Sequence, residues 1–180
     1  FLRLSRCNLA CVWCDTAYTW HFDGDERPHR NGRTFDRKAN QVTLDERDVA
    51  ERIAALGQKR LVITGGEPLL QASALAKLLD LLPDIGVEIE TNGTTKAPPR
   101  LDVRIDQFNV SPKLSHSGNP AELALIQERL DAIGALPSSG SGAESSAASS
   151  SPAEKAAALM LVATRTVNRE AVKHIGISRL

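Results

Sequence analysis

The stretch LVITGGEP, residues 61–68, determines the fold class that we predict for this chain. Residues 61–64 form a short and almost wholly apolar run, which is typical of a parallel strand buried on both faces. Two glycines follow this run, and residues 69–82 then show the spacing of a helix that Pro83 closes. A buried strand followed at once by a helix is the repeating unit of a parallel α/β fold.

Similar units extend on both sides of this stretch. Residues 43–57 begin with a capping-box pattern, Thr43 with Glu46, and continue with an apolar helical face and a final glycine. Farther on, we expect Asn119 to cap a helix that ends at Gly134. The remaining strands are predicted at residues 1–6, 87–90 and 103–110. This alternation predicts an α/β fold, a partial parallel (β/α) barrel with its helices outside.

The chain divides into three regions. Residues 1–136 form the predicted core, with a long polar excursion at residues 21–41. Residues 137–157 are a low-complexity segment that we expect to be disordered, since eight of the fourteen positions from Ser138 to Ser151 are serine. Residues 158–180 could supply one more strand and a short helix. Because the chain begins with Phe1 and its one methionine is Met160, we expect the natural N-terminus to lie upstream.

The charge balance excludes several classes of partner. Lys plus Arg and Asp plus Glu each number 22, so the formal net charge is zero. A neutral chain gives no electrostatic reason to expect nucleic acid or an anionic membrane as a partner. The sequence also has no long apolar run that could span a bilayer and no signal-peptide pattern at its start. We therefore expect a soluble, cytoplasmic protein.

All three cysteines lie close together, as Cys7-x3-Cys11-x2-Cys14. An odd number of neighbouring cysteines has no sensible disulfide pairing. Zinc needs four ligands in a structural site, and a nearby histidine such as His21 could supply the fourth. Three thiolates on one loop also suit a 4Fe–4S cluster that keeps one iron open for a ligand. Spacing favours the cluster but leaves both possibilities open.

Polar groups follow the predicted strands at the edge where parallel α/β folds bind ligands. Residues 64–67 (TGGE) combine glycines, which let a ligand approach the backbone, with a carboxylate that can accept from an ammonium group. Residues 90–94 (ETNGT) offer groups suited to ribose hydroxyls, and Ser111 and Lys113 could bind an amino-acid carboxylate. Each cluster alone reads equally well as a turn or a solvated lysine. Their shared position indicates one binding site.

The sequence CNLACVWCDT at residues 7–16, followed by GGEP, ETNG and SPK, resembles the radical S-adenosylmethionine (SAM) superfamily. More narrowly, TGGEP, EIETNGT and NVSPKLSHSGN resemble the 7-carboxy-7-deazaguanine synthases, a family of the queuosine pathway. The resemblance spans about residues 1–120 and implies a partial barrel of the radical SAM type. Two features depart from the family. Arg6 stands where the family usually has glycine, and no match continues past Gly134.

The resemblance implies a role for each matching residue. The three cysteines would ligate a 4Fe–4S cluster whose fourth iron binds SAM. Thr16 matches the Mg²⁺ ligand of the family, Arg3 would bind the substrate carboxylate, and Thr64 would hold the pterin. The implied SAM-binding residues lie beside the cluster and at the strand ends: Trp13, Cys14, Asp15, Gly66, Glu67, Thr91, Asn92, Ser111, Pro112 and Lys113.

The activity that the resemblance implies is a ring-contracting lyase. It would convert 6-carboxy-5,6,7,8-tetrahydropterin to 7-carboxy-7-deazaguanine, with the cluster, SAM and Mg²⁺ as cofactors and hydrogen abstraction by a 5′-deoxyadenosyl radical as the first step. A flavodoxin- or ferredoxin-type reductant and a homodimer are further family expectations. Two alternatives are kept. One is a radical SAM activase that acts on a partner protein, and the other is a non-catalytic protein that binds zinc or a cluster.

Overall fold

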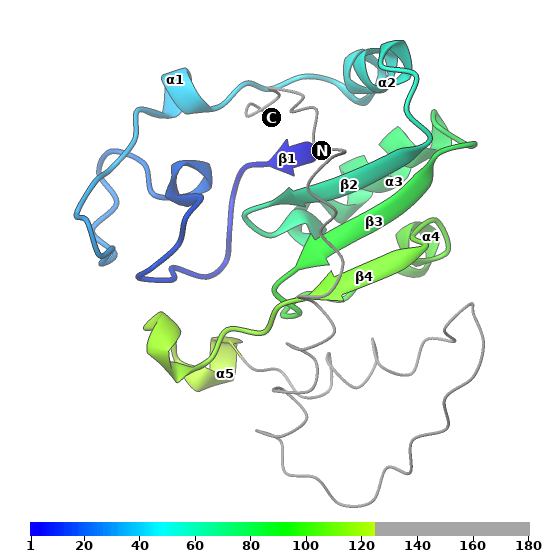
Figure 1. Ribbon diagram of the computed structural model, residues 1–180. Coiled ribbons are helices and arrows are strands. Elements are labelled where there is room, and N and C mark those ends of the chain that lie inside the picture. Colours follow the sequence, from blue (N-terminus) through cyan, green and yellow to red (C-terminus); the bar gives the residue numbers. More distant parts are fainter. Residues whose placement is uncertain (125–180) are drawn as a thin grey trace, which may run out of the picture.

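The computed structural model describes residues 1–124 and centres on a four-stranded parallel sheet in the order β1-β2-β3-β4 (Figure 1). The strands are β1 (Leu2–Leu4), β2 (Arg60–Gly65), β3 (Gly86–Thr91) and β4 (Gln107–Val110). The α-helices are α1 (Arg37–Asn40), α2 (Glu46–Ala55), α3 (Ala72–Asp80), α4 (Pro99–Asp102) and α5 (Ala121–Ala124). Three short 3-10 helices lie between them: η1 (Ala17–Thr19), η2 (Pro68–Gln71) and η3 (Ser115–Ser117).

An apolar row across the sheet fixes the register of the strands. Leu2 pairs with Ile63, Ile63 with Ile89, and Ile89 with Phe108. The first three side chains are 1%, 0% and 0% exposed. Burying each such side chain contributes about 1.5–3 kcal/mol, and a slip of one residue would turn the whole row to the opposite face. The predicted parallel α/β class is confirmed.

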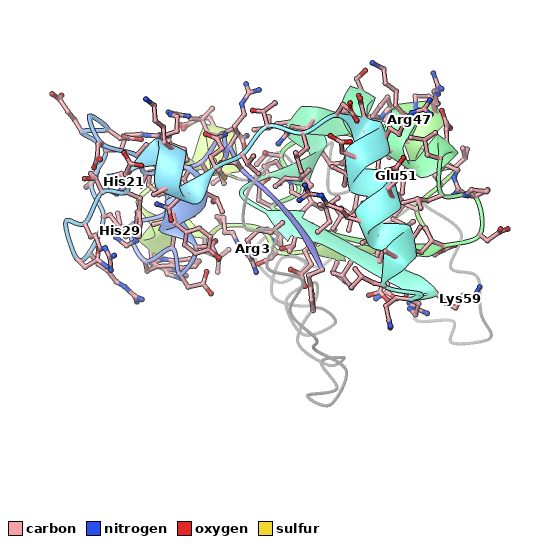
Figure 2. The ribbon with its side chains drawn as sticks, turned by 90° about the horizontal axis from the view of Figure 1, so that it is seen from above. Arg3, His21, His29, Arg47, Glu51 and Lys59 are labelled. Carbon is pink, nitrogen blue, oxygen red and sulfur yellow. The ribbon has the colours of Figure 1, made fainter. Side chains whose placement is uncertain are left out.

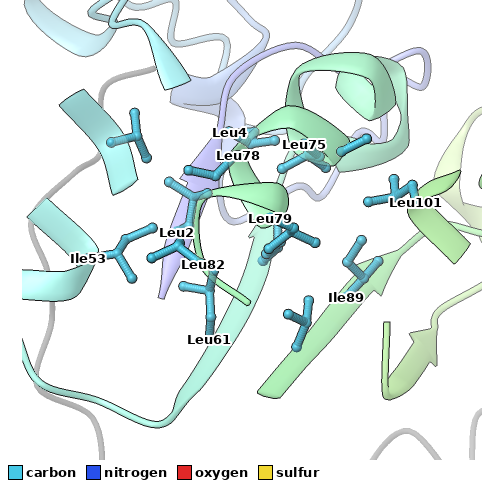
Figure 3. Close-up of a cluster of buried hydrophobic side chains, with 14 of the residues drawn as sticks. Leu2, Leu4, Ile53, Leu61, Leu75, Leu78, Leu79, Leu82, Ile89 and Leu101 are labelled. Carbon is cyan, nitrogen blue, oxygen red and sulfur yellow. The ribbon is translucent and has the colours of Figure 1, made fainter. Parts of the chain in front are cut away.

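The core lies between the sheet and the helices that cover it. Figure 3 shows Leu2, Leu61 and Ile89 of the strands against Ile53 of α2 and Leu79 of α3, all of them buried. The predicted helix 43–57 is present as α2, but its N-cap is not Thr43. The side chain of Asp45 accepts from the N–H of Asp48 (2.8 Å), so the helix begins two residues later than the capping-box pattern indicated.

Other elements also differ from their predicted bounds, since β1 is shorter than the predicted 1–6 and β3 extends one residue beyond 87–90 at each end. The helix expected at residues 69–82 begins as η2 and continues as α3 to Asp80. The strand expected at 103–110 is only β4, because α4 and the turn after it occupy the residues before Gln107. Asp106 explains that turn, since its carboxylate accepts from the N–H of Val87 (2.6 Å) and is thereby held beside β3.

All four strands point their carboxyl ends toward the same side of the molecule. In Figure 1 the arrowheads face the loop of residues 5–36 and the short helix α5. The polar clusters at 64–67, 90–94 and 111–113 therefore meet at one edge, as the sequence predicts. No helix within residues 1–124 has the length and apolar character needed to cross a membrane. The helix predicted to run to Gly134, the Ser-rich segment and residues 158–180 lie, apart from α5, outside the described residues.

Candidate active site

A cavity of about 390 Å³ opens at the carboxyl edge of the sheet. Its walls come from the cysteine loop, from Trp20 and from β1 to β4 with the residues that follow them. Of the residues predicted to bind the cluster, Mg²⁺, SAM or substrate, it is lined by Arg3, Cys7, Cys11, Trp13, Cys14, Asp15, Thr16, Thr64, Gly66, Thr91, Asn92, Ser111 and Lys113. Glu67 and Pro112 do not line it. It is also lined by Gly65 and Glu90, which belong to the predicted strand-end clusters, and by Leu9, Trp20 and Asn109, which the sequence did not single out as binding residues.

The three cysteines are free thiols that line this cavity. Cys11 is buried, and Cys7 and Cys14 are half-buried. Burial raises the pKa of the Cys7 thiol to about 11, and the nearby charge of Glu67 acts in the same direction. Burial also raises the pKa of Cys11, against the opposing effect of Lys113. At neutral pH both thiols are protonated, so a metal group that binds them must displace their protons.

Each cysteine sulfur has a polar side chain beside it. Asn119 Nδ2 donates to Cys11 Sγ at 3.3 Å, and Asn92 Nδ2 lies 4.0 Å from Cys7 Sγ. The third contact joins Cys14 Sγ to the hydroxyl of Thr16 at 3.6 Å. Donors directed at sulfur stabilise a thiolate more than a thiol, because the negative charge strengthens the hydrogen bond. The donor set therefore suits a metal-bound thiolate.

Glycine is required where the loop after β2 meets the cysteine loop. A Cβ on Gly65 would lie 2.0 Å from the carbonyl oxygen of Leu4. A Cβ on Gly66 would lie 2.1 Å from the carbonyl oxygen of Arg6 and 3.0 Å from Cys7 Cβ. The backbone after β2 therefore presses directly against the residues that lead into the first cysteine, and no side chain fits between them.

The side chain of Glu67 is fully buried and does not line the cavity. Its carboxylate accepts from the N–H of Asn92 (2.8 Å), from the N–H of Leu69 (3.0 Å) and from the hydroxyl of Thr91 (2.8 and 2.9 Å). Burial raises the pKa of this carboxyl, while the bonds from the N–H groups oppose that rise. Glu67 thus joins the loops after β2 and β3.

A second cluster of polar residues, Arg3, Thr64 and Glu90, lies on β1, β2 and β3. Arg3 pairs in register with Thr64, and the Thr64 hydroxyl donates to Glu90 Oε2 at 2.7 Å. All three side chains line the cavity. Figure 2 places Arg3 near the middle of the molecule, between the excursion with His21 and His29 and the helix with Arg47. A guanidinium and a carboxylate that line the same cavity can bind a ligand that carries both an acidic group and N–H donors.

On the opposite wall, Lys113 extends over the cysteine loop. Its Nζ donates to Ser111 Oγ at 2.9 Å and lies 5.7 Å from the centre of the Trp13 ring. Trp13 in turn stacks on His116 with ring centres 5.6 Å apart, and its Nε1 donates to the His116 carbonyl at 3.2 Å. A cation and a hydroxyl thus face the cavity from one loop and can bind a carboxylate.

His21, the fourth zinc ligand considered from the sequence, is occupied elsewhere. It is buried, and its two ring nitrogens lie 2.8 Å from the carbonyl oxygen of Arg33 and 3.0 Å from that of Arg27. In the described part of the chain, no three His, Cys, Asp or Glu side chains are placed to hold a single metal ion. His21 is therefore not placed beside the cysteines as a fourth ligand, and the three thiols line one cavity, as a 4Fe–4S cluster with three cysteine ligands requires.

Comparison with known proteins agrees with this geometry. The family model described as "Radical SAM superfamily" matches residues 2–113. The 7-carboxy-7-deazaguanine synthase of Pyrobaculum aerophilum is 37% identical over 120 residues, which are 66% of this chain and 47% of that protein. The protein of the same name from Escherichia coli K12 is 33% identical over 145 residues, 74% of this chain and 60% of that protein.

Solved structures are also similar to this chain. The crystal structure of QueE from Escherichia coli is 26% identical, with a TM-score of 0.47, over 72% of this chain and 56% of that chain. The chain spans about half the length of the curated relatives it matches.

Proposed function

The chain belongs to the radical SAM superfamily, and on this basis we propose that it catalyses the formation of 7-carboxy-7-deazaguanine from 6-carboxy-5,6,7,8-tetrahydropterin. The observation that carries the proposal is the single cavity that gathers the cysteine triad, the strand-end clusters and the pair Arg3 and Thr64. The names of the relatives support the same substrate class, since several of them are 7-carboxy-7-deazaguanine synthases.

Cys7, Cys11 and Cys14 are the residues that would hold the 4Fe–4S cluster. When bound, this cluster supplies the electron that cleaves SAM and so starts hydrogen abstraction from the substrate. The cavity fits the group in two respects. Amide donors already face two of the three sulfurs, and all three cysteines line one cavity.

We assign the binding of SAM to the wall made by Gly66, Thr91, Asn92, Ser111 and Lys113. Lys113 and Ser111 would bind the carboxylate of the methionine part, because they are a cation and a hydroxyl 2.9 Å apart on one loop. The Thr91 and Asn92 backbone borders the cavity and is fixed by the buried carboxylate of Glu67. Glu67 would act here by holding this wall, and direct contact with SAM falls to its neighbours.

The pterin would occupy the wall at the ends of β1 to β3. Arg3 would bind its carboxylate with two parallel N–H bonds, and Thr64 would contact its ring. Glu90 adds to the predicted set, since its carboxylate lines the cavity beside Thr64 and can accept from the ring N–H groups. Thr16 would contribute a hydroxyl to Mg²⁺, which substrate oxygens and water would complete. A flavodoxin- or ferredoxin-type reductant and a homodimer complete the proposal.

The test is an anaerobic assay of the full chain after cluster reconstitution, with SAM, dithionite, Mg²⁺ and the pterin, read by mass spectrometry. We expect 7-carboxy-7-deazaguanine to form. The variant Arg3→Lys should lower its rate by roughly tenfold or more, because a lysine cannot make the paired bonds. Arg47→Lys is the matched control, since Arg47 lies exposed on α2 (Figure 2).

Three other outcomes of these experiments would indicate a different function. If 5′-deoxyadenosine forms without the deazaguanine, the cluster chemistry stands and the pterin is not the substrate. If 5′-deoxyadenosine forms only when a partner protein is added, the chain is an activase. A chain that binds zinc and no sulfide under anaerobic purification contradicts the proposal as a whole.

A further inference from the structure

Asn119 contacts the cysteine loop with both ends of its side-chain amide. Its Oδ1 accepts from the backbone N–H of Ala10 at 2.8 Å, and its Nδ2 donates to Cys11 Sγ at 3.3 Å. The two contacts join positions 109 and 108 residues apart in the chain. The sequence predicts that Asn119 caps the helix that begins at residue 120. Its side-chain amide instead binds Ala10 and Cys11 of the cysteine loop.

The orientation of this amide is fixed by its partners. The backbone N–H of Ala10 can only donate, so the atom that faces it must be the carbonyl oxygen of Asn119. The amide nitrogen is therefore directed at Cys11, and it also donates to the buried Oγ of Ser117 at 3.1 Å. A flipped amide would place its NH₂ against the Ala10 N–H and would lose that bond.

The segment that carries Asn119 is itself held against the cysteine loop. The N–H of Val12 donates to the Ser117 carbonyl at 2.9 Å. Gly118 allows the approach, because a Cβ there would lie 2.7 Å from Val12 Cγ1 and its φ is +79°. The contact from Asn119 to Cys11 thus belongs to a close fit between two backbone segments.

We propose that Asn119 is a positioning residue of the cluster site, which holds the loop of Cys11 and makes the bound cluster easier to reduce. The proposal rests on the cluster assigned above. Reduction adds one negative charge to the cluster, and part of this charge lies on the cysteine sulfurs. An N–H donor directed at such a sulfur stabilises the reduced form more than the oxidised form and raises the reduction potential.

The other cysteines receive weaker support of this kind from side chains in residues 1–124. Asn92 Nδ2 lies 4.0 Å from Cys7 Sγ, and the Thr16 hydroxyl lies 3.6 Å from Cys14 Sγ. Both distances exceed the 3.3 Å between Asn119 and Cys11. Asn119 is therefore the residue whose replacement should change the potential most.

The experiment compares Asn119→Ala with Asn119→Asp in the full reconstituted chain. The alanine variant loses both contacts. The aspartate variant keeps an oxygen for the Ala10 N–H but places a carboxylate oxygen where the donor faced Cys11. The fraction of reduced cluster is measured by electron paramagnetic resonance against solution potential, without SAM or pterin. Asn40→Ala is the control, because Asn40 lies on α1 and bonds only locally to the Asp36 carbonyl.

We expect the ratio of reduced to oxidised cluster at a fixed potential to fall by roughly three- to tenfold in Asn119→Ala. A tenfold change corresponds to about 59 mV for one electron. The fall should be larger in Asn119→Asp, since a negative charge then replaces the donor. The control should match the unmodified chain.

A purely structural role gives a different order of effects. In that case Asn119→Asp would keep the unmodified potential, and only Asn119→Ala would change, which would overturn the proposal. Loss of iron from Asn119→Asp would also overturn it, because the retained bond to Ala10 should suffice to hold the loop. An unmodified chain that assembles no cluster contradicts this proposal together with the proposed function, whereas a missing lyase activity leaves the potential measurement intact.

Discussion

Glu67 and Asn92 are joined by a hydrogen bond from the Asn92 N–H to Glu67 Oε2 of 2.8 Å, and the carboxylate that accepts it is fully shielded from solvent. The same carboxylate also binds the Thr91 hydroxyl. The GGEP glutamate therefore holds the ETNG loop in place from behind the cavity wall.

We predict that Glu67→Gln lowers the free energy of unfolding by about 2 kcal/mol, because a buried NH₂ then faces a backbone N–H and both lose a partner. Chemical denaturation of the cluster-free chain measures this change. Glu88→Gln is the matched control. Glu88 pairs with the exposed Arg60 at the surface, and its replacement should change stability by less than about 1 kcal/mol. Equal effects of the two substitutions would contradict a joining role for Glu67.

Arg6 carries backbone strain beside the first cysteine. Its φ is +81°, and it is the one non-glycine residue with positive φ in the described chain. We predict that Arg6→Gly raises the free energy of unfolding by about 1 kcal/mol, since glycine adopts this conformation without a steric cost. Arg6→Ala removes the same guanidinium but keeps the Cβ, so it should bring no gain. A gain in both variants would assign the effect to the charge instead.

The raised pKa of Cys7 makes the stability of the cluster-free chain depend on pH. Because folding raises this pKa from 9.0 to about 11, folding favours the neutral thiol. The stabilisation is complete below about pH 9 and is lost as the pH rises toward 11, by up to about 2–3 kcal/mol. Denaturation curves across this range should show a steeper fall for the unmodified chain than for Cys7→Ser, which has no thiol to titrate. If the stability of both chains falls equally with pH, Cys7 is not the cause of the pH dependence.

The substitution Gly118→Ala tests how closely the segment of Gly118 approaches the cysteine loop. We predict that Gly118→Ala costs roughly 2–4 kcal/mol, from the strained φ and from the contact with Val12. Gly24→Ala measures the cost of the positive φ alone. Gly24 has a φ of +89° but nothing within 4 Å of the point that a Cβ would occupy. Combining Gly118→Ala with Val12→Ala should recover the contact term. Additive effects in this double-mutant cycle would show that the two residues do not interact.

The proposed Mg²⁺ ligand is tested by Thr16→Ala. SAM cleavage should continue in this variant, while the increase in product that Mg²⁺ brings to the unmodified chain should be reduced, since one oxygen ligand is lost. The assay is a titration of product formation with Mg²⁺. Thr43→Ala, at a position before α2 and away from the cavity, serves as the control. An unchanged response in Thr16→Ala would remove this residue from the metal site.

Much of the fold and the cavity follows from local patterns in the sequence. The run at residues 61–64 and the polar groups after each strand predict the sheet and the edge that binds ligands, because parallel topology brings strand ends together. The capping pattern placed α2 but selected Thr43, while Asp45 is the cap. Both residues are good acceptors, and only the path of the preceding loop decides between them.

Long-range contacts of single side chains were beyond the reach of such patterns. Asn119 before Pro120 has the local signature of a helix cap, and nothing near it in the sequence points to Cys11. Glu67 looks like a ligand-binding carboxylate because it follows two glycines. Its burial depends on how closely β3 lies to β2, which is a property of the assembled sheet.

The clamp between Asn119 and Cys11 has a consequence for the timing of cofactor insertion in the cell. During synthesis Cys11 leaves the ribosome before Asn119, which follows 108 positions later. At about 5–20 residues per second, the thiols wait roughly 5–20 s before the clamp can close. Until Asn119 has been synthesised, the cysteine loop lacks its two contacts with this residue. Iron and sulfide delivered before Asn119 is made meet a cysteine loop without the Asn119 contacts. Delivery after that point meets a loop that Asn119 can hold in place.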